Sequence, residues 1–403
     1  MPLKRKNPPF ENFAVPGFRA SGIASGIKKN GKKDLALILS DKPAYVAGLF
    51  TTNRVKAAPV LLDLKRIKKG VSRGVIINSG NANACTGKAG YKTAEAMATL
   101  AEKASGAKRG TIMVASTGVI GVPLPVGKVE AGIAALAGSL SYSGLTGAAE
   151  AIMTTDAFMK KAISKVNIGG KRVTIAGIAK GAGMICPDMA TMLAFFVTDA
   201  NIKGPALRRA LKKAADASFN SIIVDNDTST NDTVMIFANG CSGSSEIRPG
   251  TNDFEAFEKA LRGISLELAH MIVKDGEGAT RFIEIELKGA TSNESARKAA
   301  RTIAESFLVK TAFFGGDPNW GRILAALGRS GVKMREEKVD ISLNGVPVVK
   351  KGLDTGREKE AAKAIKEKEV KVSVDLKMGR RSTRLWTSDL SFEYVRINSA
   401  YRT

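Results

Sequence analysis

The stretch KGAGMICPDMATML, residues 180–193, combines residue types that could carry out acyl transfer. A threonine released as a new chain end, Thr191, would hold its own α-amino group beside its hydroxyl, and that amine could take the hydroxyl proton. Release requires the Thr191 hydroxyl to attack the carbonyl of Ala190, and a tight turn built from glycines and Pro187 would favour that attack. The simpler alternative is that Thr191 only begins a buried strand, TMLAFFVTD, behind a glycine turn.

The chain has few residues that could support other nucleophilic mechanisms. The only histidine, His270, is expected on a helix over 253–273, nearly opposite the apolar face, which predicts a solvated surface residue rather than a catalytic base. Ser-His-Asp and Cys-His mechanisms and histidine-based metal sites therefore lack their central residue. Three widely separated cysteines indicate neither a disulfide framework nor a zinc site, and reduced thiols fit a cytosolic protein.

Composition narrows the class of protein further. The chain has 403 residues, 44% of them apolar, which is enough to bury a large core. Its 62 basic and 38 acidic residues give a net charge of +24, but the basic residues occur in small scattered groups without an RNP-like motif, so nucleic acid is not an expected partner. The uncharged segment 110–127 contains two prolines and four glycines, which favours a strand and a turn over a membrane span. No hydrophobic run follows the basic start of the chain, so a cytoplasmic location is expected.

The hydrophobic periodicity predicts an α+β fold, with mixed α and β layers in which half-buried antiparallel sheets are covered by helices. Strands are expected at 34–40, 74–80, 111–117, 171–178, 281–287, 338–343 and 369–376. Helices are expected at 92–105, 203–217, 253–273, 294–308 and 358–368. A further strand, SFEYVRI, is expected over 391–397, just before the end of the chain.

Eight motifs, in order along nearly the whole chain, resemble those of the ornithine acetyltransferase family, the bifunctional glutamate N-acetyltransferases of cyclic arginine biosynthesis. The motifs are NSGNANACTG at 78–87, ASTGVIG at 115–121, IMTTDAF at 152–158, KGAGMICPDMATML at 180–193, NDTSTNDTV at 226–234, KDGEGATR at 274–281, GGDPNWGR at 315–322 and the C-terminal NSAYRT. The resemblance implies a DmpA/ornithine-acetyltransferase-like fold with antiparallel sheets packed between helices.

The resemblance also implies a precursor that cuts itself between Ala190 and Thr191. Residues 1–190 would form an α chain with the oxyanion-hole region, and residues 191–403 a β chain that begins with the nucleophile. The two chains would form one intertwined catalytic unit with a smaller C-terminal subdomain. Thr191 would accept the acetyl group from N2-acetylornithine, release ornithine and pass the acetyl group to glutamate in a ping-pong reaction. The family suggests an α2β2 heterotetramer without cofactor or metal, and the sequence leaves open whether acetyl-CoA is also a donor.

Individual residues match the family's functional positions. Thr117 and Gly118 match the oxyanion hole, where a hydroxyl and a main-chain N–H would stabilise the negative oxygen of the tetrahedral intermediate. The residues that match substrate-binding positions, besides Thr191 itself, are Thr154 (with Thr155 as the adjacent alternative), Lys180, Glu277, Asn398 and Thr403. Lys180 could pair with a substrate carboxylate or polarise the reacting group, and Glu277 could hold an amino group.

The chain departs from the usual family pattern at Cys186 and Asp188, where alanine and asparagine are more common. A carboxylate three residues from Thr191 would raise the pKa of its amine, so Asp188→Asn is expected to change the rate of self-cleavage. The motifs NANACTG and GGDPNWGR are expected to be scaffolding loops, the second with an ion pair between Asp317 and Arg322. The alternative function is a self-processing N-terminal-nucleophile amidohydrolase or aminopeptidase, in which water accepts the acyl group.

Overall fold

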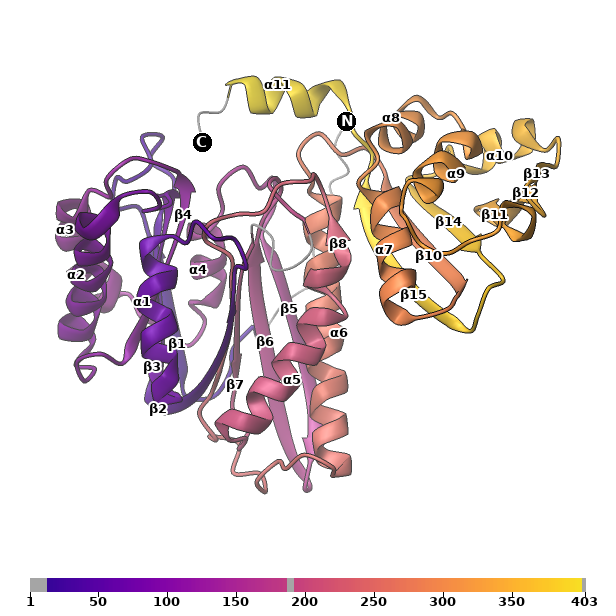
Figure 1. Ribbon diagram of the computed structural model, residues 1–403. Helices are drawn as coiled ribbons and strands as arrows, with labels where there is room; N and C mark the ends of the chain where they lie inside the picture. Colours follow the sequence, from indigo (N-terminus) through magenta and orange to yellow (C-terminus); the bar gives the residue numbers. More distant parts are fainter. Residues whose placement is uncertain (1–12, 187–191, 401–403) are drawn as a thin grey trace.

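The computed structural model describes residues 13–186 and 192–400, which form two β-sheets with helices packed against them (Figure 1). The first sheet has the order β4 (Ile112–Val119), β3 (Val71–Asn81), β2 (Leu35–Phe50), β9 (Thr233–Ala238), β7 (Leu193–Thr198), β6 (Lys171–Lys180) and β5 (Lys160–Ile168), and β1 (Phe18–Ile23) also pairs with β2. The second sheet has the order β13 (Leu353–Asp354), β12 (Val346–Lys350), β11 (Asp340–Leu343), β14 (Glu369–Asp375), β10 (Phe282–Ala290), β15 (Arg381–Ser388) and β8 (Ile222–Ile223). The predicted mixed α and β architecture is confirmed.

Both sheets contain parallel as well as antiparallel pairs, whereas antiparallel sheets are expected from the sequence. The parallel pairs are β3 with β4, β7 with β9, β10 with β14, and β15 with β8. Alternation of apolar and polar residues identifies a half-buried strand, but it carries no information about the direction of the neighbouring strand. Each of the seven strands predicted between residues 34 and 376 overlaps an observed strand.

Side chains alternate between the two faces of the first sheet, as the two-residue period of a strand requires. Along β2, Leu37 packs with one group of helices and Ile38 packs toward the opposite face. The helices on the Leu37 side are α1 (Ala58–Arg66), α2 (Gly87–Ser105) and α3 (Val126–Gly138). On the Ile38 side lies α4 (Leu145–Ala151). Elsewhere on the sheet, α5 (Gly204–Asp216) packs against β2 and β9, and α6 (Asn252–Lys274) packs against β5 and β6.

Besides α6, which contacts β8 and β15, four helices of the described chain pack against the second sheet: α7 (Asn293–Ala304), α8 (Phe307–Gly315), α9 (Trp320–Gly328) and α10 (Glu358–Ala364). The single helix predicted over 294–308 is divided in two. The first part, α7, ends at Ala304 with Glu305 as its C-cap. Ser306 begins the second part, because its side chain accepts a hydrogen bond from the Val309 N–H and so caps α8.

The segment predicted as a C-terminal strand is a helix, α11 (Phe392–Ala400). Figure 1 shows this helix crossing above the first sheet from the side of the second. The alternating letters of SFEYVRI fit a strand, but strand preference depends on a neighbouring strand to pair with. In the structure, Glu393 and Arg396 form an ion pair at the three-residue spacing of a helix.

His270 is not the solvated residue that the sequence analysis predicts. One face of α6 packs against β5 and β6, and His270 on another face lies between the rings of Phe282 and Trp386, with centroids 5.1 and 4.6 Å away. Burial lowers the pKa of His270 to about 4. The sequence pattern of α6 reveals only its more apolar face. The face that carries His270 is covered by the second sheet.

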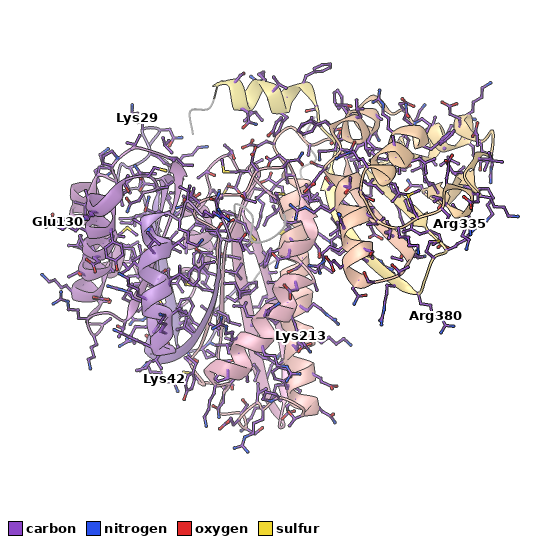
Figure 2. All side chains as sticks on the ribbon, in the orientation of Figure 1. Lys29, Lys42, Glu130, Lys213, Arg335 and Arg380 are labelled. Atoms are coloured by element: carbon purple, nitrogen blue, oxygen red, sulfur yellow. The ribbon has the colours of Figure 1, made fainter. Side chains whose placement is uncertain are left out.

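The positively charged side chains are distributed over the surface around both sheets. Figure 2 shows Lys29, Lys42, Lys213, Arg335 and Arg380 projecting outward at separate places around the molecule, and all five are exposed. Within the described residues, no helix is both long and apolar enough to cross a membrane.

Candidate active site

A pocket that encloses about 600 Å³, part of it open solvent, lies at one end of the first sheet. The strand ends meet there because Lys180, the last residue of β6, is paired with Leu193, and Leu193 with Thr233 at the start of β9. The pocket brings together most of the residues singled out in the sequence: Thr117, Gly118, Thr154, Thr155, Lys180, Glu277 and Asn398. Ala190, Thr191, Asp188 and Thr403 lie outside the described residues.

Thr117 and Gly118 occupy the end of β4, where a close approach to β3 requires glycine. Gly118 has a φ of 134°, and a Cβ atom there would lie 2.3 Å from the carbonyl carbon of Gly80. The preceding residue is held from two sides, because the Ser116 hydroxyl donates to Asn78 Oδ1 and the Ser116 carbonyl accepts from Asn231 Nδ2. The two candidate oxyanion residues therefore stand on a fixed backbone.

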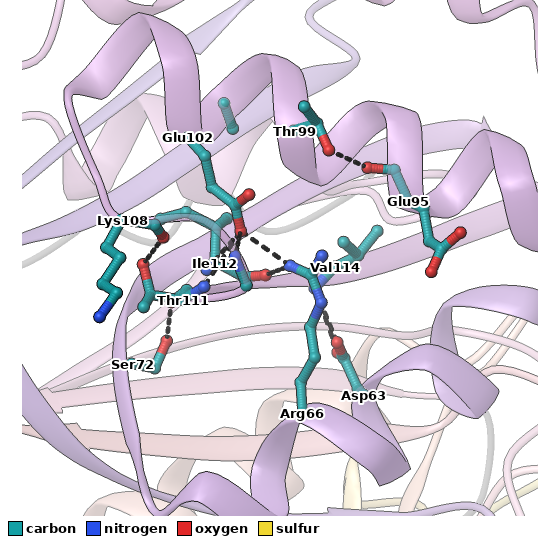
Figure 3. Close-up of polar contacts among 12 residues, drawn as sticks. Asp63, Arg66, Ser72, Glu95, Thr99, Glu102, Lys108, Thr111, Ile112 and Val114 are labelled. Carbon is teal, nitrogen blue, oxygen red and sulfur yellow. Dashed lines mark hydrogen bonds and ion pairs between the residues drawn. The ribbon is translucent and has the colours of Figure 1, made fainter.

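Side chains from α1 and α2 fix the outer edge of β4 (Figure 3). The Ile112 N–H donates to Glu102 Oε1 and the Val114 N–H donates to Asp63, both at 3.1 Å. Arg66 donates to the Ile112 carbonyl and to Glu102. Burial raises the pKa of Asp63. The helices thus satisfy main-chain groups on the edge of β4 that bind no strand of the described chain, and they hold the strand that carries Thr117.

Among the described residues that line the pocket, Lys180 is the cation. It is only 4% exposed, and its Nζ atom donates to the Thr117 hydroxyl at 3.3 Å. Burial lowers the pKa of Lys180, and the carboxylate of Asp156 is the strongest opposing influence. A lysine in this position can present an ammonium to an anionic ligand in a site that excludes most water.

Glu277 and Asn398 form the rim of the pocket on the side of α11. Asn398 Nδ2 donates to Glu277 Oε2 at 2.8 Å, so the C-terminal helix contacts the acidic residue directly. The helix is also attached where the Ser391 hydroxyl donates to the Gly278 carbonyl at 2.6 Å. A Cβ atom on Gly278, whose φ is 70°, would lie 2.5 Å from the Tyr394 nitrogen, so glycine permits this contact.

Three polar residues of the site come from the motif NDTSTNDTV, and none of them was predicted individually from the sequence. Ser229 and Asn231 line the pocket, and Asn231 Nδ2 donates to the carbonyls of Ala82 and Ser116. Asp232 is fully buried; its Oδ1 accepts from the Met192 N–H at 3.0 Å, and burial raises its pKa. The motif is a run of polar residues between two apolar strands, β8 and β9, and this pattern could have indicated a functional loop.

The predicted ion pair of the GGDPNWGR loop is wrong. In the described chain, Asp317 accepts a hydrogen bond from Asn319 Nδ2, and Arg322 donates instead to the Leu308 carbonyl. Asn319 caps α9 by accepting from the Arg322 N–H, so the loop is ordered by capping rather than by charge pairing. Across residues 13–186 and 192–400, no group of three His, Cys, Asp or Glu side chains converges as metal ligands would.

Comparison with known proteins shows which class of protein is similar to this chain: its relatives are bifunctional proteins of arginine biosynthesis. The arginine biosynthesis bifunctional protein ArgJ of Symbiobacterium thermophilum is 50% identical over 393 residues, 97% of this chain and 98% of its own. The protein of the same name from Geobacter sulfurreducens is 49% identical over 391 residues, 96% of this chain and 100% of its own. A crystal structure of ArgJ from Bacillus halodurans, 42% identical, aligns with a TM-score of 0.50 over 51% of this chain and 98% of that chain.

Residues 19–403 match the ArgJ family, and the chain belongs to that family. The predicted family and the prediction that the protein is an enzyme, an acyltransferase, are both confirmed.

Proposed function

We propose that the protein transfers the acetyl group of N2-acetylornithine to glutamate in arginine biosynthesis, through an acetyl ester on Thr191. The observation that carries this proposal is a small pocket beside the main one. Met192 and Leu193, which directly follow Thr191, line it together with Thr117 and Lys180. The start of the proposed β chain therefore adjoins the proposed oxyanion hole and the buried cation.

The reaction needs no group beyond those of the chain and its substrates. The α-amino group of Thr191 takes the hydroxyl proton as the oxygen attacks the acetyl carbonyl. The Thr117 hydroxyl and the Gly118 N–H stabilise the negative oxygen of the tetrahedral intermediate. Ornithine leaves with its nitrogen protonated, and the amine of glutamate then attacks the ester, which returns the Thr191 hydroxyl.

The charges of the pocket suit amino-acid substrates. Lys180 binds a carboxylate of the substrate, and Glu277 binds an amino group. Thr154, Asn398 and Thr403 supply hydrogen bonds in this proposal, with Thr155 as the neighbour that could take the place of Thr154. Acetyl-CoA as a second acetyl donor to glutamate belongs to the same proposal, and so does a cytoplasmic location.

Two observations support self-cleavage between Ala190 and Thr191. The Bacillus halodurans chain is covered to 98% but covers only 51% of this chain, so it is about half as long, as a processed chain would be. In addition, the first sheet contains strands from both sides of the proposed cut, and β6 pairs with β7 along six residue pairs. Chains 1–190 and 191–403 would therefore remain one folded unit, and two copies of each would form the α2β2 assembly.

The test begins with intact mass and N-terminal sequencing of the wild-type protein beside Thr191→Ala. Two wild-type fragments, one beginning Thr-Met-Leu, are expected, and the variant should stay whole. N2-acetylornithine is then supplied with and without glutamate. Formation of N-acetylglutamate supports the transferase, whereas acetate released equally in both reactions identifies an amidohydrolase. A wild-type chain that stays uncut rejects both.

A further inference from the structure

A buried network of three charged residues lies beside the pocket. Lys160 Nζ donates to Asp156 Oδ1 at 2.6 Å and to Asp275 Oδ2 at 2.5 Å. The three side chains are at most 3% exposed. None of them is among the residues that line the pocket, so a role in the reaction must pass through other residues.

Asp156 connects two walls of the pocket. Its Oδ2 accepts from the Thr154 N–H at 2.8 Å, and its Oδ1 accepts from the Gly181 N–H at 2.7 Å. Gly181 directly follows Lys180, so the same carboxylate sets the backbone on both sides of the pocket. Removal of this carboxylate would free both segments.

Asp275 extends the network to a third wall. It accepts from the Ala157 N–H at 3.1 Å and stands two residues before Glu277. The Glu277 N–H in turn donates to the carbonyl of Ala182, on the segment that follows Lys180. The network therefore connects the segments that carry Thr154, Lys180 and Glu277 of the pocket.

Lys180 depends on charges that it does not touch. Within the described chain it forms no ion pair, and its hydrogen bond to Thr117 uses one of the three N–H groups of an ammonium, which leaves the others for a ligand. The charged groups that influence it are Asp156, Glu277 and Asp232, which favour the protonated form, and Lys160 and Lys28, which oppose it.

We propose that Asp156 is a positioning residue that holds Lys180 in place as an ammonium, ready to bind the carboxylate of an amino-acid substrate. The identity of that ligand rests on the proposed function, whereas the coupling of Asp156 to Lys180 does not. Burial alone would raise the pKa of Asp156, but Lys160 and Lys180 hold it well below its usual range, so this carboxylate stays ionised. Burial raises the pKa of Asp275 to about 6 and also raises that of Asp232, which makes both less dependable counter-charges at neutral pH.

The test is an NMR titration of Lys180 without substrate. In protein labelled with ¹³C at the lysine ε-carbon, the Lys180 signal is the one missing from Lys180→Arg, and its shift is followed from about pH 6 to about pH 11. Asp156→Asn is expected to raise the acid dissociation constant of Lys180 about tenfold, so that the lysine loses its proton at lower pH.

Lys160→Met provides a change of opposite sign. It removes a neighbouring positive charge and should make Lys180 hold its proton to higher pH. General destabilisation cannot move the titration in both directions. Asp275→Asn is the matched control, because it leaves the Asp156–Lys160 pair intact and should change the dissociation constant less than about threefold.

An unchanged Lys180 titration in either Asp156→Asn or Lys160→Met would overturn the proposal. Thermal unfolding shows whether each variant is folded, and if Asp156→Asn is not, Lys160→Met decides the question alone. The two proposals fail separately: a protein that never cleaves itself rejects the function, whereas a cleaved, active protein with an insensitive Lys180 rejects only the role of Asp156.

The same role predicts a distinct kinetic pattern in the active enzyme. Asp156→Asn should raise KM for N2-acetylornithine, and the increase should grow with pH as Lys180 loses its proton. A purely structural defect would instead reduce kcat by a factor that does not vary with pH.

Discussion

The Lys180 ammonium donates a hydrogen bond to the Thr117 hydroxyl across 3.3 Å, which joins the end of β6 to the end of β4 inside the pocket. Four strands lie between β6 and β4 in the sheet order, and the contact exists because the strand ends converge there. The ammonium and the hydroxyl both line the small pocket that Met192 and Leu193 also line, so they lie next to the start of β7.

Replacement of Lys180 should separate activity from stability. Lys180→Met removes a buried ammonium that has no ion-pair partner in the described chain, so the melting temperature is expected to stay the same or rise. Acetyl transfer should fall about 100-fold or more, because the substrate carboxylate loses its partner. Thermal unfolding and a transfer assay on the same preparation check both parts. A large drop in melting temperature would show that Lys180 mainly supports the fold.

Gly118 should tolerate no side chain. In Gly118→Ala the new Cβ would meet the backbone of Gly80, and the free energy of unfolding should fall by about 2 kcal/mol or more. Chemical denaturation measures this loss. Gly127→Ala is the control, because a Cβ there meets nothing within 4 Å and the residue lies in α3, where alanine is favoured. Equal stability of the two variants would contradict the close approach of β3 and β4.

Asn231 should stabilise the end of β4. Asn231→Ala leaves the carbonyls of Ala82 and Ser116 without their side-chain donor, which is expected to cost about 2–4 kcal/mol of stability. Asn226→Ala, in the same motif, is the control: Asn226 is exposed, so the change should be within about 0.5 kcal/mol. Urea denaturation compares the two variants, and indistinguishable midpoints would rule out this role for Asn231.

His270 should make the fold sensitive to acid. Burial lowers its pKa to about 4, below the ordinary value of 6.5, so the unfolded state binds more protons between these values. Its contribution to stability is therefore present above about pH 6.5 and is lost as the pH falls toward 4. His270→Phe should reduce the acid-induced loss by about 1–2 kcal/mol, allowing for partial exposure. Melting temperatures at about pH 7.5 and pH 4.5 measure the difference, and equal losses in both proteins would refute it.

The sequence predicts elements whose pattern is local and misses features that depend on distant partners. The strand over 171–178 and the helix over 253–273 are present because their own residues form an apolar face. The segment 391–397 has an alternating pattern, but in the described chain it pairs with no strand, and Phe392–Ala400 forms the helix α11. His270 was misplaced because its second packing surface is formed by Phe282 on the next strand, β10, and by Trp386 on the distant strand β15, and the helical pattern contains neither.

The residues of the pocket also divide into those that a local motif predicts and those that depend on distant partners. Thr117, Lys180 and Glu277 were predicted because their motifs resemble those of the family. The structure brings these three residues together in the pocket. The sequence could not show that Asp156 and Asp275 both bind the ammonium of Lys160, because Lys160 and Asp275 are 115 residues apart in the chain. Charge networks of this kind become visible only when the chain is folded.

The carboxylates and the arginine along the outside of β4 also limit how molecules of this protein can associate. The main-chain groups of Ile112 and Val114 that would bond to an additional strand are already bonded to Glu102, Arg66 and Asp63. A second copy therefore cannot extend the first sheet at this edge without displacing buried charges. Any larger assembly must be built through other surfaces, and sheet-to-sheet polymerisation is blocked at the strand that carries Thr117.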